Sequence, residues 1–132
     1  MNAFIVELEH KPGSFAKMAE AIAASGINIT SVSGTTCGTK GSVALLTNDE
    51  PGTRRALAAA HYTYRDFEIV SSTLEDKPGT LAAATRKLAD AGVNIEAILP
   101  TGMSGNKVTV GFATDNPSRA RTALGELVGA AR

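Results

Sequence analysis

One stretch of this sequence occurs twice, and that repetition constrains the fold more than any other feature. A Lys-Pro-Gly turn at Lys11–Gly13 returns at Lys77–Gly79, and Asn28 returns as Asn94. Both pairs are separated by 66 positions, and an alanine-rich run lies between the two markers in each copy. Fixed self-similarity of this kind reflects architecture, and two copies are too few for a solenoid. The sequence therefore predicts two similar modules packed together.

Size and charge limit what such modules can be. The chain has 132 residues, of which 43% are hydrophobic and 20% charged, so it is globular. A core of about 66 residues is marginal alone, so we expect the halves to share a core or sheet and the chain to form a homodimer. Thirteen basic residues balance thirteen acidic ones, which predicts neither a nucleic-acid partner nor a membrane partner.

The expected location is the cytoplasm. Cys37 is the only cysteine, so no intrachain disulfide can form, which fits a reducing compartment. The N-terminus lacks the charged and apolar regions of a signal peptide. No apolar run reaches the roughly 20 residues of a membrane span.

The first half has the pattern β-α-β-β-α. Alternation over Ala3–Glu9 predicts a strand, and the proline and glycine after it predict a turn. Ser14 is a candidate N-cap for an amphipathic helix. The apolar stripe of this helix is Phe15, Met18, Ala19 and Ile22. Strands at Ile27 to about Thr36 and at Ser42–Thr47 follow, and a helix then runs from Asn48 to about Ala60.

The segment 62–75 is the expected junction between the two modules. One extended stretch there would serve as the last strand of the first repeat and the first strand of the second. Its apolar pattern changes phase near Ile69–Val70, which predicts a bulge or kink. The second half then repeats the plan, and no residues remain after its last helix for a final strand. We expect the resulting edge to be shielded by the junction strand, the other repeat or a second chain.

These elements predict an α+β fold of two ferredoxin-like βαββαβ repeats, at 1–68 and 69–132. Each would have an antiparallel sheet with its helices on one face. The last strand of the second repeat would be missing.

The residues at the two turns carry a family resemblance. A strand ending in Lys-Pro-Gly is followed by a helix and then by Gly-Ile/Val-Asn-Ile. These markers are Lys11–Gly13 with Gly26–Ile29, and Lys77–Gly79 with Gly92–Ile95. This arrangement resembles the ACT domain, and the resemblance covers nearly the whole chain. It implies a tandem-ACT protein with no catalytic domain attached.

The resemblance also implies a function and a site. ACT domains are regulatory modules that typically bind amino acids, often where two modules meet and partly on the loop between first strand and first helix. The helix N-terminus there suits a carboxylate, and glycine allows close backbone approach. The expected ligand-binding residues are His10, Lys11, Pro12, Gly13, Ser14, Asn28, Ile29, Asp76, Lys77, Pro78, Gly79, Thr80, Asn94 and Ile95. The family commonly has a neutral amide where His10 and Asp76 stand, and Asp76 could instead bind an ammonium group.

Simpler interpretations stand beside this one. The turns could be mere connections, and Asn28 and Asn94 could hydrogen-bond local backbone. His10 reads as a solvated loop residue, His61 as a helix-end residue and Cys37 as an inert thiol. We identify no catalytic residues, metal ligands or cofactor fingerprint, so no enzyme activity and no cofactor are expected.

The sequence therefore favours a non-catalytic regulatory module that binds a small amino acid or related metabolite at inter-repeat or dimer interfaces. The alternative is a regulatory subunit that acts mainly by protein–protein contact, on a regulated enzyme or another regulator, with vestigial ligand sites.

Overall fold

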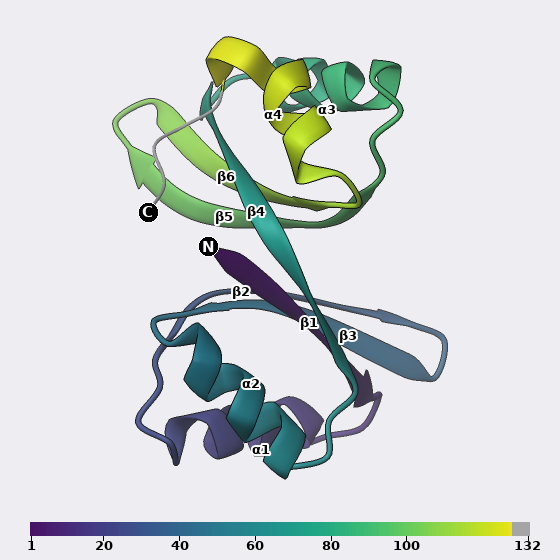
Figure 1. The fold of residues 1–132 in the computed structure, drawn as a ribbon, viewed down its shortest axis with the longest axis vertical. Helices are drawn as coiled ribbons and strands as arrows, with labels where there is room; N and C mark the ends of the chain where they lie inside the picture. Colours follow the sequence, from purple (N-terminus) through teal and green to yellow (C-terminus); the bar gives the residue numbers. More distant parts are fainter. Residues whose placement is uncertain (128–132) are drawn as a thin grey trace. The chain divides into compact units, whose positions relative to one another are not determined.

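The computed structural model describes residues 1–127 (Figure 1). Within this range the chain forms six strands and four α-helices. It divides into two compact units: the first unit is Asn2–Asp66, and the second unit is Met1 with the chain from Phe67 onward. Positions 128–132, to which the predicted second repeat extends, lie outside the described residues.

In the first unit two helices cover one side of an antiparallel sheet (Figure 1). Its elements are β1 (Asn2–Glu9), α1 (Ser14–Ala23), β2 (Ile29–Cys37), β3 (Lys40–Thr47), α2 (Glu50–Ala59) and the start of β4 (Tyr64–Glu75). Strand β3 pairs with both β1 and β2. Just before β4, the amide of Glu7 donates to the carbonyl of Thr63 at 3.0 Å, which places the incoming chain beside β1.

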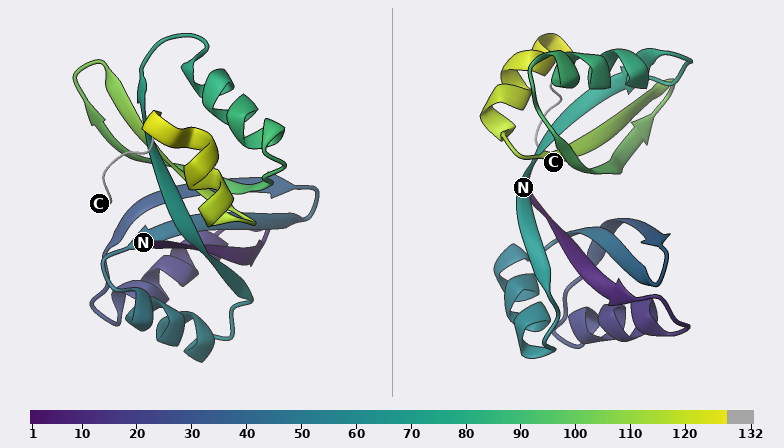
Figure 2. Two further views of the ribbon diagram at one scale, coloured as in Figure 1. Left: turned by 45° about the horizontal axis from the view of Figure 1, so that its top comes forward. Right: turned by 90° about the vertical axis from the view of Figure 1, so that its right-hand side faces the viewer.

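The second unit has the same kind of arrangement (Figure 2). After the rest of β4 come α3 (Thr80–Asp90), β5 (Ile95–Ser104), β6 (Lys107–Thr114), α4 (Pro117–Leu124) and a 3-10 turn at Gly125–Leu127. Strand β6 pairs antiparallel with β4 and with β5. On β4, the amide of Ile69 donates to the carbonyl of Met1 at 2.8 Å. The predicted α+β class with antiparallel strands is confirmed.

Each unit has its own core, made where the inward face of the strands meets the two helices. In the first unit the fully buried side chains include Phe4, Val6, Met18, Ile22, Leu45 and Leu57. In the second they include Val70, Ala84, Leu88, Phe112 and Leu124. The period-2 pattern of the strands and the period-3.6 pattern of the helices produce these clusters.

The start of α1 differs from the prediction in two details. Gly13, not Ser14, is the N-cap, with φ +88°, and no side chain caps the helix. A positive φ suits glycine because it has no Cβ. Phe15 is 42% exposed rather than buried. It lines a shallow groove together with Gly34 and Thr36 of β2.

The bulge predicted near Ile69–Val70 is not present in the pairing of β4 with β6. Strand β4 pairs with β6 without a register shift from Ile69 opposite Ala113 to Glu75 opposite Lys107. Four consecutive residues, 69 to 72, are buried. Because neighbouring strand residues point to opposite faces, both faces of β4 are covered here. This two-sided burial accounts for the change of apolar phase at Ile69–Val70 without a bulge in the pairing with β6.

Candidate functional site

The turn between β1 and α1 supplies the predicted His10–Ser14 group. The amide of Lys11 donates to the carbonyl of Glu9 at 3.0 Å, and the amide of Ser14 donates to the carbonyl of Lys11 at 3.3 Å. These bonds close a tight turn, and Gly13 then starts the helix. His10 is exposed, and its amide donates to the carbonyl of Thr39 at 3.4 Å. The turn is thus tied to the tip of the β2–β3 hairpin.

An open cavity of about 980 Å³ lies against this turn. Its lining comes from the end of β1 at residues 7–9, residues 11–14 of the turn, the following part of α1, the β2–β3 hairpin with Thr39 and Lys40 at its tip, and the segment 60–63 that follows α2. Such a volume lies within the range of pockets that hold small molecules. Four of the predicted residues, Lys11 to Ser14, therefore lie together at one cavity.

The charged side chains of the cavity are mostly lysines. Lys11, Lys17 and Lys40 line it together with Glu7 and Glu9. Lys11 Nζ lies 3.0 Å from Glu9 Oε2. The hydrogen bond and charge of Lys11, with a smaller effect from Lys17, lower the pKa of Glu9 from its ordinary value. Glu9 thus remains an anion at neutral pH, and three lysines face two glutamates.

His61 also lines this cavity and has an unusual backbone. Its φ is +63°, the only positive value at a non-glycine residue among positions 1–127. Its amide donates to the carbonyl of Ala58 at 3.1 Å, and the amide of Tyr62 donates to the carbonyl of Leu57 at 3.0 Å. These bonds end α2 in the left-handed conformation that glycine usually supplies. The prediction that His61 is a helix-end residue is confirmed.

Sequence reasoning missed Lys17, Lys40 and His61 as cavity residues. A βαββαβ unit brings the end of its first strand, its central hairpin and the end of its second helix to the same end of the sheet. That topology was the signal that could have found Lys40 and His61. Lys17 lies one helical turn after Gly13, outside the apolar stripe of α1.

The second turn, at Asp76–Gly79, has the same backbone and different side-chain contacts. Gly79 has φ +93° and caps α3 without a side-chain bond. The amide of Asp76 donates to the carbonyl of Asn106 at 2.7 Å. Thr80 Oγ1 donates to the carbonyl of Glu75 at 2.7 Å and to that of Lys77 at 3.2 Å. The Thr80 hydroxyl therefore holds the turn closed.

The predicted asparagines lie at the other end of the helices from the turns. Asn28 and Asn94 follow the C-termini of α1 and α3, whereas the turns precede their N-termini. A ten-residue helix is about 15 Å long. A unit therefore does not bring its own turn and asparagine together. Ile29 and Ile95 are half-buried, and each packs against the core of its own unit.

Local bonds hold both asparagines. The Asn28 amide donates to Asn48 Oδ1 at 3.0 Å, and the Asn48 amide donates to the Asn28 carbonyl at 3.1 Å. The Asn94 amide donates to Asp115 Oδ1 at 3.0 Å, and Asn94 Nδ2 donates to Asp115 Oδ2 at 3.3 Å. The side chain of Asn94 is thus engaged, whereas the contacts of Asn28 involve its main chain.

Among residues 1–127, no three His, Cys, Asp or Glu side chains are grouped so as to hold a metal ion. In the same range no helix is long and apolar enough to cross a membrane.

Comparison with known proteins places the fold. Neither a family model nor a curated protein sequence matches the chain. Among solved structures, protein BT0572 from Bacteroides thetaiotaomicron is 22% identical, with a TM-score of 0.77 over 95% of this chain and 86% of that one. The regulatory subunit of aspartate kinase from Thermus thermophilus is 21% identical, with a TM-score of 0.64 over 93% and 87%. That from Thermus flavus is 20% identical, with a TM-score of 0.65 over 93% and 90%. The predicted resemblance to ACT-domain proteins is confirmed at the level of the fold.

Proposed function

We propose that this chain is a non-catalytic regulatory protein of two ACT-like repeats, 1–68 and 69–132, which binds a small amino acid or related metabolite. The observation that carries the proposal is the cavity built on Lys11–Ser14, the turn that the sequence predicts as a ligand site. The fold shared with regulatory subunits of aspartate kinase, along nearly their whole length, supports a regulatory role.

The position of the asparagines bears on how the ligand is held. Because a turn and its own asparagine lie at opposite ends of a helix, a ligand that touches both must lie where two modules meet. We therefore propose a homodimer in which the Lys11–Gly13 turn of one copy and Asn28 of the other approach the same ligand. The exposed side chain of Asn28, which makes no side-chain hydrogen bond within residues 1–127, supports this arrangement.

Thermal unfolding tests the proposal. The midpoint is measured with each of the twenty amino acids at millimolar concentration. A ligand at a hundred times its Kd adds about 2.7 kcal/mol to stability, so a binder gives a clear rise. Asn28→Ala should abolish that rise, whereas Asn106→Ala, an exposed hairpin change, should preserve it. A panel without any shift would refute ligand binding by this class of molecule.

A second candidate function is protein contact with vestigial ligand sites. Large apolar side chains are exposed in both units, including Phe15, Leu81 and Met103, the last being 73% exposed. Exposed apolar side chains favour association with another protein surface. A flat amino-acid panel, together with concentration-dependent sedimentation that Phe15→Glu abolishes, would favour this function over ligand sensing.

A further inference from the structure

The two turns occupy matching places and differ in charge. His10 in the first turn corresponds to Asp76 in the second, 66 positions later. Lys17 on α1 corresponds in the same way to Ala83 on α3. Lys11 and Lys77 are each paired with the preceding glutamate, at 3.0 and 2.8 Å. One helical turn after the glycine, α1 therefore carries a second lysine ammonium, Lys17, where α3 has the methyl group of Ala83.

The two turns also differ in how they are closed. In the second unit the Thr80 hydroxyl donates to two carbonyls of its turn. Ser14 stands at the matching position, and within the described residues its side chain makes no such bond. The hydroxyl of Ser14 is half-buried at the cavity wall and remains free to contact a ligand.

The surroundings of the two asparagines also favour ligand binding in the first unit. Asn94 is bonded through its main chain and its side chain to the carboxylate of Asp115. In the first unit the neutral Asn48 occupies that place beside Asn28. A carboxylate ligand near Asn94 would meet the negative charge of Asp115, and it would also have to displace an existing hydrogen bond.

From these three differences we infer that only the first unit binds ligand, that one ligand binds per chain, and that this ligand is a small molecule of net negative charge. The cavity explains the charge preference, because Lys11, Lys17 and Lys40 line it against Glu7 and Glu9. Lys11 is engaged with Glu9, so Lys17 and Lys40 are the side chains that bind the anion. This inference rests on the proposed function and names the ligand class of that site.

Isothermal titration of the full chain with aspartate, glutamate and succinate, against asparagine, glutamine and lysine, tests the inference. The amides match the acids in shape and lack the charge. We expect the acids to bind at one per chain. Lys17→Ala, which gives α1 the residue found on α3, and Lys40→Ala should each weaken binding about tenfold, as loss of a charged hydrogen bond does. Lys107→Ala is the matched control, because Lys107 faces Glu75 as Lys40 faces Glu9.

These measurements distinguish a failure of the single anion site from a failure of ligand binding altogether. The inference is supported if one acid binds per chain, if Lys17→Ala and Lys40→Ala each weaken this binding, and if Lys107→Ala leaves it unchanged. Two ligands per chain, tighter binding of an amide or of lysine, or loss on Lys107→Ala would overturn it while leaving a ligand-binding module. If no probe binds here and no amino acid shifts the unfolding midpoint, the proposed function itself is refuted. The unliganded unfolding midpoints of the exposed lysine variants show that each is folded.

Discussion

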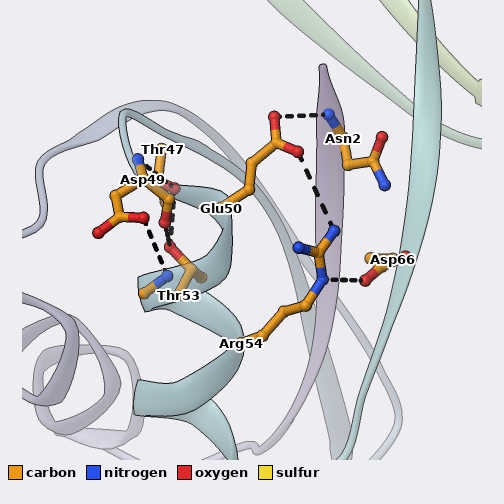
Figure 3. Close-up of polar contacts among 8 residues, drawn as sticks. Asn2, Thr47, Asp49, Glu50, Thr53, Arg54 and Asp66 are labelled. Carbon is orange, nitrogen blue, oxygen red and sulfur yellow. Dashed lines mark hydrogen bonds and ion pairs between the residues drawn. The ribbon is translucent and has the colours of Figure 1, made fainter.

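The side chain of Arg54 lies over the ring of Phe4, with its guanidinium carbon 5.4 Å from the ring centroid. Arg54 Nε donates to Asp66 Oδ2 at 2.8 Å, and Nη2 lies 4.0 Å from Glu50 Oε1 (Figure 3). Glu50 in turn accepts from the amide of Asn2 at 3.1 Å. One side chain on α2 thus contacts β1 through an aromatic ring and the start of β4 through a carboxylate.

We predict that Arg54→Ala lowers the free energy of unfolding by about 1–2 kcal/mol. A cation–π contact contributes about 0.5–1 kcal/mol at an exposed site. The ion pairs add a similar small amount, since the side chain is 37% exposed and solvent screens it. Urea unfolding measures the loss. Arg55→Ala, next to it and exposed, should change stability by less than about 0.5 kcal/mol. Equal effects of the two variants would contradict the assigned contacts.

In the second unit, α4 carries an arginine at the position that matches Arg54 of α2, but this arginine pairs with a different carboxylate. Arg121 on α4 lies 67 positions after Arg54 and forms an ion pair with Glu68 of β4. In the first unit the carboxylate comes from Asp66, at the strand that follows α2. Within the described residues no strand follows α4, so the carboxylate comes instead from the first strand of that unit.

The sequence predicted the repeat but not that its period changes. The turns, first helices and asparagines recur at 66, whereas Val43 matches Val110 and the N-caps Asp49 and Asn116 match at 67. The extra residue is Thr101, where the pairing of β5 with β6 shifts register between Pro100 and Gly102. A bulge adds one residue to one strand, and only the pairing locates it.

The sequence alone also does not predict most of the residues that line the cavity. The Lys-Pro-Gly turn was visible because proline and glycine report backbone geometry locally. The contribution of Lys40 and His61 depends on how a hairpin and a helix end fold back toward that turn, which is a tertiary effect. The sequence also does not show that the length of α1 separates Asn28 from the turn of its own unit, because that distance follows from the folded helix.

We predict that Gly111→Ala destabilises the chain by about 1–3 kcal/mol. A Cβ at Gly111 would lie 2.8 Å from Ile69 Cγ2 and 3.2 Å from Thr101 Cγ2, so the mutant must shift its neighbours. Thermal and urea unfolding measure the effect. Gly34→Ala is the matched control on β2, where a Cβ meets its nearest atom at 3.8 Å. That variant should be neutral or slightly stabilising, because alanine is preferred to glycine within a strand. A neutral Gly111→Ala would show that the bulge at Thr101 yields.

Ser72→Ala should stabilise the chain by about 1 kcal/mol. Ser72 is fully buried, and among residues 1–127 its hydroxyl has no hydrogen-bond partner. An unpaired buried hydroxyl costs about 1–3 kcal/mol, and its removal leaves only a small void. Val6 holds the matching place in the first unit, which shows that the position accepts an apolar side chain. The urea midpoint should rise, whereas that of exposed Ser33→Ala should stay within about 0.5 kcal/mol of the parent. A fall for Ser72→Ala would mean that the hydroxyl is satisfied.

The acid titration of Glu75 should depend on Lys77. The hydrogen bond and charge of Lys77 hold the pKa of Glu75 below its ordinary 4.5, and Glu75 likewise raises the pKa of Lys77. A carboxylate with a lowered folded-state pKa stabilises the fold above its unfolded pKa, and this contribution is lost as the pH falls through the folded value. Lys77→Gln should therefore raise the pKa of Glu75 toward 4.5 and flatten the pH dependence of stability below that value.

Carboxyl carbon NMR titration of Glu75 measures this shift directly. Lys11→Gln provides the matched control, because Lys11 acts on Glu9 in the first unit and should move the pKa of Glu9 alone. Both pairs are exposed, so high salt should reduce each shift. An unchanged Glu75 titration in Lys77→Gln would show that the 2.8 Å contact between Lys77 and Glu75 is not populated in solution.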